Sequence, residues 1–271
     1  MLLPRAARAC GALFLSGLFL SFVAALPARA DASVPGGVPA IAAASDLQFA
    51  LPEAAARFRT DTGRAVKIVF GSSGNFHRQI REGAPFELFL SADEGYVLDL
   101  ARAGLAADEG ALYAEGRIVL LVPPSSPLKP DGTLRDLAAA LDAGKVARFA
   151  IANPDHAPYG RAAREALKAA GLWDRIAGKL VLGENVSQAA QFATRGSASG
   201  GIVAYALALS PKVAARGAYA LIPAGYHAPL HQRMVLLKGA GETARAFYAF
   251  LCAPAGRAVL KTYGFALPGE E

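Results

Sequence analysis

From Val38 onward, short runs of apolar and β-branched residues alternate with stretches of helical periodicity along nearly the whole chain. This alternation constrains the fold strongly, because parallel strands need long, usually helical, connections between them. The pattern predicts an α/β protein in which mainly parallel sheets are flanked by helices. The predicted strands cover residues 41–43, 66–70, 87–90, 117–122, 149–152, 180–182, 201–203, 219–222 and 233–237.

The order of these elements predicts two lobes rather than one sheet. The run 117–122 is stopped by two prolines and leaves the first α/β unit, and a second unit then repeats the pattern. The last stretch, 243–263, is helical with an interruption at Pro254, and we expect it to pack back on the first unit. Two crossovers then join two lobes with a ligand cleft between them. We place lobe 1 at residues 31–120 with 228–271, and lobe 2 at residues 121–227.

The first thirty residues have the pattern of a secretory signal peptide. Arg5 and Arg8 precede the apolar run 12–26, and Ala28-Arg29-Ala30 supplies the small residues of a cleavage site. The apolar run is shorter than the roughly 20 residues that span a bilayer. We therefore expect residues 1–30 to be removed, leaving a secreted chain that begins at Asp31.

Charge and cysteine content exclude two classes of protein. Removing residues 1–30 removes three arginines and no acidic residue, so the formal charge falls from +6 to +3. The remaining charges are scattered, whereas a nucleic-acid-binding protein needs a clustered basic face. Cys10 leaves with the signal peptide, so Cys252 stays alone and a disulfide framework is excluded. We expect Cys252 to be buried and inert on a helix, and the chain to be monomeric.

Four turns share one design, in which small or hydroxyl residues stand after a predicted strand and directly before a helix. Such a turn leaves the first backbone N–H groups of the helix unpaired and places the positive end of the helix dipole there. In open α/β sheets, ligands lie at this carboxyl edge. The four turns are Ala44-Ser45-Asp46, Gly71-Ser72-Ser73-Gly74, Ala157-Pro158-Tyr159-Gly160 and Glu184-Asn185-Val186-Ser187.

The donors at these turns predict a small ligand that is rich in acceptor oxygens. Ser45 and Ser73 supply hydroxyl groups, Tyr159 supplies a phenol, and Ala157 and Val186 supply only backbone N–H groups. An arginine counter-ion is not required. Each turn alone is equally compatible with ordinary helix capping, so the prediction depends on the placement that all four share.

These residues, in this order, resemble the periplasmic molybdate-binding proteins. The resemblance covers nearly all of the mature chain, and two of the matching segments are especially specific, namely 83–93 (GAPFELFLSAD) and 153–158 (NPDHAP). The other matching segments are 42–47, 70–74, 78–80, 159–160, 184–186 and 201–203.

The resemblance implies a two-lobed type II periplasmic-binding fold that closes over molybdate or tungstate. It implies delivery to the permease and ATPase of an ABC importer, and it implies no cofactor and no cation bound by protein ligands. By position, the oxyanion-binding residues are Ser45, Asp46 through its N–H, Ser73, Tyr159 and Val186, with Ser72, Ala157 and Tyr205 as further possibilities.

This chain departs from the family pattern at three positions. Some members have a tyrosine ligand at the position of Ala204, whereas here Tyr205 comes one residue later. Tyr159 stands where other members have a small residue, so its phenol is a candidate replacement. Asp46 stands where a neutral residue is common, and its carboxylate would repel an oxyanion unless it points away.

Other functions stay open at this point. Sulfate and phosphate are alternative oxyanions, since donors alone do not set the size of a cavity, and Asp46 could accept the proton of a phosphate. A hydrolase would use Ser45 or Ser73 as nucleophile, with His77 as the best available base, but the sequence has no Gly-x-Ser-x-Gly motif. A ligand-sensing regulator is disfavoured by the signal peptide. His156 has no metal-ligand spacing, and we expect a structural role for it.

Overall fold

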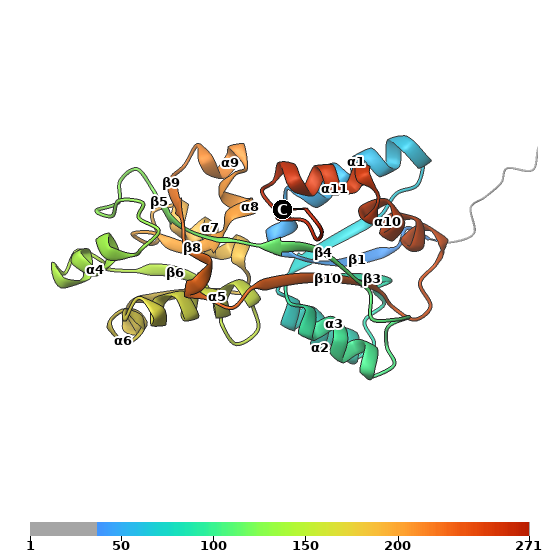
Figure 1. Ribbon diagram of the computed structural model, residues 1–271, viewed down its shortest axis with the longest axis horizontal. Coiled ribbons are helices and arrows are strands. Elements are labelled where there is room, and N and C mark those ends of the chain that lie inside the picture. Colours follow the sequence, from blue (N-terminus) through green and yellow to red (C-terminus); the bar gives the residue numbers. More distant parts are fainter. Residues whose placement is uncertain (1–36, 271) are drawn as a thin grey trace, which may run out of the picture. The chain divides into compact units, whose positions relative to one another are not determined.

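Ten strands of the described chain form two five-stranded sheets (Figure 1). The structure, a computed structural model, describes residues 37–270, so the predicted signal peptide 1–30 lies outside the described residues. The first sheet has the order β2-β1-β3-β10-β4, and the second has the order β7-β6-β8-β5-β9. The strands are β1 (Ala40–Ala44), β2 (Lys67–Gly71), β3 (Leu88–Ser91), β4 (Ala111–Gly116), β5 (Ile118–Val122), β6 (Phe149–Ala152), β7 (Leu180–Gly183), β8 (Gly201–Ala204), β9 (Ala218–Leu221) and β10 (Leu230–Leu236).

In each sheet, four strands run in one direction and one strand runs against them. In the first sheet β10 is antiparallel to both of its neighbours, β3 and β4, and in the second sheet β5 is antiparallel to β8 and β9. These reversed strands are the first that the chain forms after each passage from one sheet to the other. The prediction of mainly parallel sheets flanked by helices is therefore confirmed.

Alternating side chains of the first sheet build two separate hydrophobic layers. Ile41 packs with Phe58 and Phe247 on one face, whereas the next residue, Ala42, packs with Phe76 on the other. This alternation follows from the two-residue period of a strand. The first face is covered by α1 (Ala50–Thr62), α10 (Glu242–Cys252) and α11 (Pro254–Thr262), and the second by α2 (Ser73–Arg81) and α3 (Glu94–Arg102).

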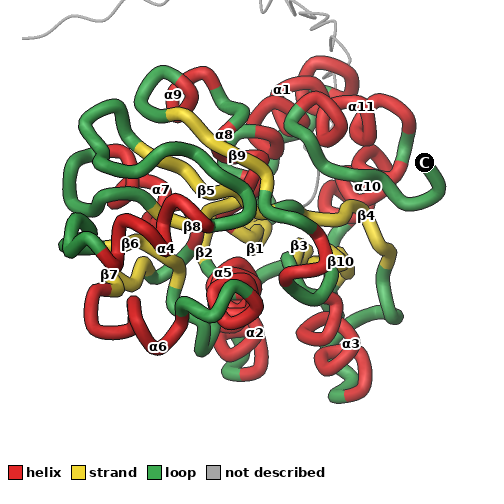
Figure 2. The backbone as a smooth tube through the Cα atoms, turned by 60° about the vertical axis from the view of Figure 1, so that its left-hand side comes forward, coloured by secondary structure: helices red, strands yellow, loops and turns green. Residues whose placement is uncertain are grey.

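The second sheet is also covered on both faces. The connections β6 to β7 and β7 to β8 cross the sheet in opposite directions, so right-handed crossovers place their helices on opposite faces. Figure 2 shows the strands in yellow between these helices. The elements of this part are α4 (Arg135–Asp142), α5 (Pro158–Ala169), α6 (Trp173–Ile176), η2 (Ala177–Lys179), α7 (Val186–Thr194), α8 (Tyr205–Ala208), α9 (Pro211–Ala214) and η3 (Ala224–Tyr226).

Two expectations from the sequence are corrected, one about the boundary between the lobes and one about the burial of Cys252. A boundary after residue 120 falls inside β5, all of whose residues belong to the second sheet, so lobe 2 begins a few residues earlier. Cys252 is exposed rather than buried. The apolar stripe of α10 runs through Ala244, Phe247 and Leu251, and Cys252 lies one residue beyond it. The last helices do pack on the first unit, where the rings of Phe58 and Phe247 are 5.1 Å apart.

Candidate functional site

The four strand-to-helix turns meet at one small cavity. Ser45 and Asp46 line it at the end of β1. Ser73 lines it in the turn that follows β2, Tyr159 in the turn that follows β6, and Val186 in the turn that follows β7. The space inside it is about 10 Å³, far below the roughly 300–1,000 Å³ typical of pockets for drug-sized ligands. The cavity therefore suits a ligand of only a few atoms. The remaining lining residues are Ala44, Gly71, Ser72, Ala92, Ala157 and Pro158.

Helix starts face this cavity from both lobes. α2 begins at Ser73 and α7 begins at Val186, and the first N–H groups of a helix have no acceptor within it. The residue before α7, Asn185, caps it by accepting a hydrogen bond from the N–H of Gln188 at 3.1 Å. Lys, Arg and His are absent from the described residues that line the cavity. Backbone N–H groups, helix dipoles and hydroxyl groups are therefore the donors that an anion would meet.

Two buried serines have their oxygen atoms occupied and their hydroxyl protons available. Ser45 Oγ accepts a hydrogen bond from the N–H of Ser187 at 3.3 Å, and Ser73 Oγ accepts one from the N–H of Ala92 at 3.0 Å. Since a hydroxyl group has one proton to donate, each serine can direct that proton at a ligand. Ser45 also joins the two lobes, because Ser187 belongs to α7.

Ser72 has a different role from these serines. Its Oγ accepts a hydrogen bond from the N–H of Asn75 at 3.4 Å and lies 2.9 Å from Nδ1 of His156. His156 Nε2 lies 3.6 Å from a carboxylate oxygen of Glu184. Ser72 therefore caps α2 and connects the lobes, which agrees with the structural role expected for His156.

Asp46 lies in a buried hydrogen-bond network at the wall of the cavity. Its Oδ2 accepts hydrogen bonds from the phenol of Tyr159 at 2.9 Å and from Nε2 of Gln232 at 2.7 Å. Tyr113 donates its phenolic proton to Oε1 of Gln232 at 2.7 Å. Asp46 Oδ1 is buried and has no hydrogen-bond partner among the described residues. One carboxyl oxygen is thus held by two side-chain donors, and the other makes no regular hydrogen bond, although the backbone N–H groups of Asp46 and Leu47 lie close to the carboxyl group.

Burial dominates the ionisation of this network. Desolvation raises the pKa of the Asp46 carboxyl from 3.8 to about 6, although the hydrogen bonds from Gln232 and Tyr159 and the nearby backbone N–H groups of Asp46 and Leu47 oppose the shift. Desolvation, followed by the charge of Asp46, raises the pKa of Tyr159 and of Tyr113 well above the usual value. Both phenols are therefore neutral donors at physiological pH.

The lobes touch through further contacts around the cavity, so the structure is a closed form. The N–H of Gly74 donates to the carbonyl oxygen of His156 at 2.9 Å. A Cβ atom on Gly74 would lie 2.6 Å from that oxygen, so the close approach requires glycine. Arg161 of α5 pairs with Asp93, whose carboxylate also caps α3 through the N–H of Gly95.

The structure gives the remaining candidate residues no direct role in binding a ligand. Ala157 lines the cavity, but its N–H donates to the carbonyl oxygen of Asn153 at 2.9 Å, so it is not free for a ligand. Tyr205 is not among the lining residues, and its ring instead packs 5.6 Å from that of Tyr219. His77, whose Nε2 bonds to Asp99 at 2.7 Å, does not line the cavity, and among the described residues it makes no hydrogen bond with Ser45 or Ser73.

Gln232 and Tyr113 belong to the site's network but were missed by sequence analysis. Gln232 is fully buried in β10 on the same side as Leu230 and Met234, and the alternation of this strand is the signal that could have identified it. The pairing of β10 with β4 shifts register between Gln232 and Arg233. Such irregularities redirect side chains and often occur beside functional sites.

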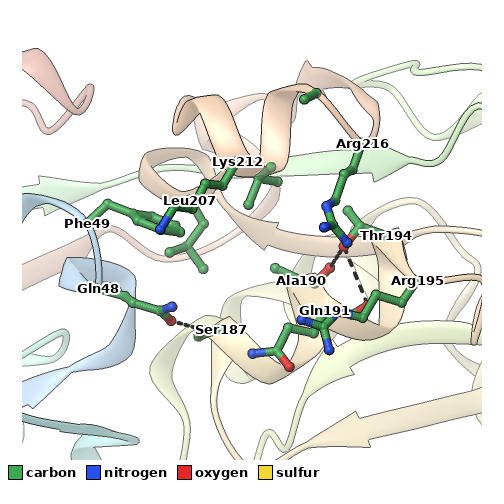
Figure 3. A pocket seen from close by; sticks show the side chains of 12 residues that line it. Gln48, Phe49, Ser187, Ala190, Gln191, Thr194, Arg195, Leu207, Lys212 and Arg216 are labelled. Carbon is green, nitrogen blue, oxygen red and sulfur yellow. Dashed lines mark hydrogen bonds between the residues drawn. The ribbon is translucent and has the colours of Figure 1, made fainter.

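A larger hollow lies nearby and has a different character (Figure 3). It has a volume of about 410 Å³, and its lining combines apolar side chains with neutral polar ones such as Gln48 and Gln191 and with the exposed Arg195, Lys212 and Arg216. The hydrogen bond between Ser187 of α7 and Gln48 joins the lobes at its edge. Three of the four predicted turns contribute nothing to its lining, so we take the small cavity as the candidate site.

Two further findings concern residues 37–270 alone. No helix in this range is both long and apolar enough to cross a membrane. The same range holds no group of three or more His, Cys, Asp or Glu side chains arranged to bind a metal ion.

Two lobes that close over a small donor-lined cavity define a solute-binding protein, and comparison with known proteins agrees. Residues 40–266 match the bacterial extracellular solute-binding proteins, and the chain belongs to this family. It is 36% identical over 238 residues to the molybdate-binding protein ModA of Rhodobacter capsulatus, covering 86% of this chain and 90% of that protein. It is 33% identical to the protein of the same name from Escherichia coli K12, covering 93% of this chain and 96% of the relative. The solved periplasmic molybdate-binding protein of Azotobacter vinelandii aligns with a TM-score of 0.75 and 31% identity, covering 85% of this chain and 99% of the other.

Proposed function

We propose that this protein captures molybdate or tungstate in the periplasm and delivers it to the permease and ATPase of an ABC importer. The observation that carries the proposal is the convergence of four helix-forming turns on one small cavity, whose lining among residues 37–270 has hydroxyl and N–H donors and no cationic side chain. Relatives that are similar along nearly their whole length are named as molybdate-binding proteins. We infer secretion from the predicted signal peptide at residues 1–30, and we expect the mature protein to act as a monomer.

We propose that donors from both lobes bind the anion. Ser45 and Ser73 would donate their hydroxyl protons, and the backbone N–H groups of Asp46, Tyr159 and Val186 would complete the shell. In this assignment the phenol of Tyr159 holds Asp46 in place, because its proton is directed at that carboxylate. An anion that contacts both lobes binds the closed form better than the open form, so it shifts the population toward closure. The closed, loaded protein would then dock on the permease.

Sulfate and phosphate are the main alternative ligands. The cavity volume excludes large organic ligands but does not distinguish among tetrahedral oxyanions. The hydrolase alternative is disfavoured because its candidate base, His77, does not line the cavity with Ser45 and Ser73.

Calorimetric titration of the mature, anion-stripped protein tests the proposal. Molybdate, tungstate, sulfate and phosphate are titrated in separate runs at the same pH and ionic strength. We expect tight one-to-one binding of molybdate and tungstate, with sulfate and phosphate at least about 100-fold weaker, a difference of roughly 2.7 kcal/mol. Preferential binding of sulfate or phosphate would replace the ligand, and no binding of any of the four would refute the function.

A further inference from the structure

The proposed binding of the anion uses the backbone N–H of Asp46 and gives no role to its carboxyl group. A site for a dianion gains nothing from a second negative charge, yet Asp46 is 1% exposed and lines the cavity. Its Oδ2 is occupied by two donors, and its Oδ1 is buried without a partner. A buried polar atom without a partner is costly, so Oδ1 needs a ligand group or a proton.

The groups that surround Asp46 do not neutralise its charge. α5 contributes Tyr159, β10 contributes Gln232 and β4 contributes Tyr113, all of them neutral. The start of α2 contributes the hydroxyl groups of Ser72 and Ser73, while β3 and α7 contribute Ala92 and Val186. No lysine, arginine or histidine is among the causes that shift the pKa of Asp46. Since no cationic side chain lies among the described lining residues, a proton is the simplest group that could cancel this charge.

We propose that Asp46 takes up one proton from solvent when the oxyanion binds, and that the resulting carboxylic acid donates it from Oδ1 to an oxygen of the anion. This inference rests on the proposed function. No covalent bond of the anion changes, because the proton moves from solvent to the carboxylate and is then shared in a hydrogen bond. Tyr159 and Gln232 continue to hold Oδ2, which leaves Oδ1 as the oxygen for the proton. Asp46 then changes from a group that repels the anion into one of its donors.

The proposal sets the sign of the pH dependence. In the closed structure without an anion the carboxyl pKa of Asp46 is about 6, and a bound dianion raises that pKa further because like charges disfavour ionisation. Below the free pKa, Asp46 already carries the proton and the affinity is independent of it. Above it, binding must draw a proton from solvent, so the affinity falls about tenfold for each pH unit until the pKa of the loaded protein is reached.

The proposal also predicts that proton uptake differs from one oxyanion to another. Molybdate and sulfate have to bring a proton from solvent, whereas hydrogen phosphate already carries one that an ionised Asp46 could accept. Any binding of phosphate should therefore show no proton uptake, whereas binding of molybdate should take up about one proton.

The test is titration calorimetry with molybdate in buffers of different ionisation enthalpy at pH 6.5, 7.5 and 8.5, because the slope of the heat against that enthalpy counts the protons exchanged. We expect about one proton taken up per anion at pH 7.5 and an affinity that falls about tenfold from pH 6.5 to 7.5. Asp46→Asn should bind molybdate with no proton uptake and no slope, because its amide can donate from the same position at every pH. Asp99→Asn, which changes an exposed carboxylate on α3, should retain the wild-type slope.

The outcomes separate the two proposals. If the wild-type protein binds molybdate with no proton uptake and a flat affinity between pH 6.5 and 8.5, the role of Asp46 is wrong and the proposed function stands. If it binds no molybdate at any of these values, the proposed function itself fails. The wild-type measurement decides the question even if Asp46→Asn does not fold.

Discussion

Replacing Ser73 by alanine tests the donor model of the site at one atom. Ser73 is fully buried at the first position of α2, and its Oγ accepts the N–H of Ala92 at 3.0 Å. The hydroxyl proton is thereby left for the oxyanion. Ser73→Ala removes that donor and adds no new group to the cavity.

The expected loss of molybdate affinity follows from the charge of the ligand. A hydrogen bond to a charged group contributes about 1.5–3 kcal/mol net, so the dissociation constant for molybdate should rise about 10- to 100-fold. The N–H of Ala92 loses its acceptor in the free and loaded protein alike, so that cost of about 1–3 kcal/mol appears in the free energy of unfolding instead.

Calorimetric titration with molybdate and thermal unfolding of the ligand-free protein measure the two effects separately. Ser210→Ala is the matched control, because Ser210 is equally buried, donates to the carbonyl oxygen of Leu207 at 2.9 Å and does not line the cavity. It should lower stability and leave the affinity unchanged. The reasoning fails if Ser73→Ala binds molybdate as tightly as the wild type, or if Ser210→Ala weakens binding as much.

Three further substitutions test the closed form and the limits of the site. Tyr159→Phe removes the hydrogen bond that links α5 to Asp46, and calorimetry should show molybdate affinity lowered about 10- to 100-fold; an unchanged affinity would mean that this contact does not stabilise the loaded form. Gly74→Ala places a Cβ atom 2.6 Å from the carbonyl oxygen of His156 and so should keep the lobes from closing fully. Small-angle scattering with saturating molybdate should then show a larger radius of gyration than in the wild type, and equal radii would argue against a role of this contact in closure. Tyr205→Phe changes a ring outside the cavity lining, and its affinity should stay within about twofold of wild type; a larger loss would return Tyr205 to the site.

Local sequence determined most of the secondary structure and the chemistry of the turns. Apolar runs such as Ile41 to Ala43 predicted strands because a buried strand needs continuous apolar residues. The small and hydroxyl residues that follow them predicted helix starts, because the side chains and backbone that cap a helix act within a few residues of each other. Donor groups at Ser45 and Ser73 could therefore be identified before any contact between distant residues was known.

Tertiary structure decided which sheet each strand joins and what each donor contacts. The run 117–122 is recognisable as a strand, but its pairing in the second sheet depends on partners far away in the chain. The same holds for Gln232, which reaches Asp46 across 186 positions of sequence. Burial then gives Asp46 a raised pKa and leaves Oδ1 without a partner, since desolvation depends on every element that closes the cavity. A property of one carboxyl group thus arises from contacts among many segments, whereas the strands and caps follow from residues next to one another.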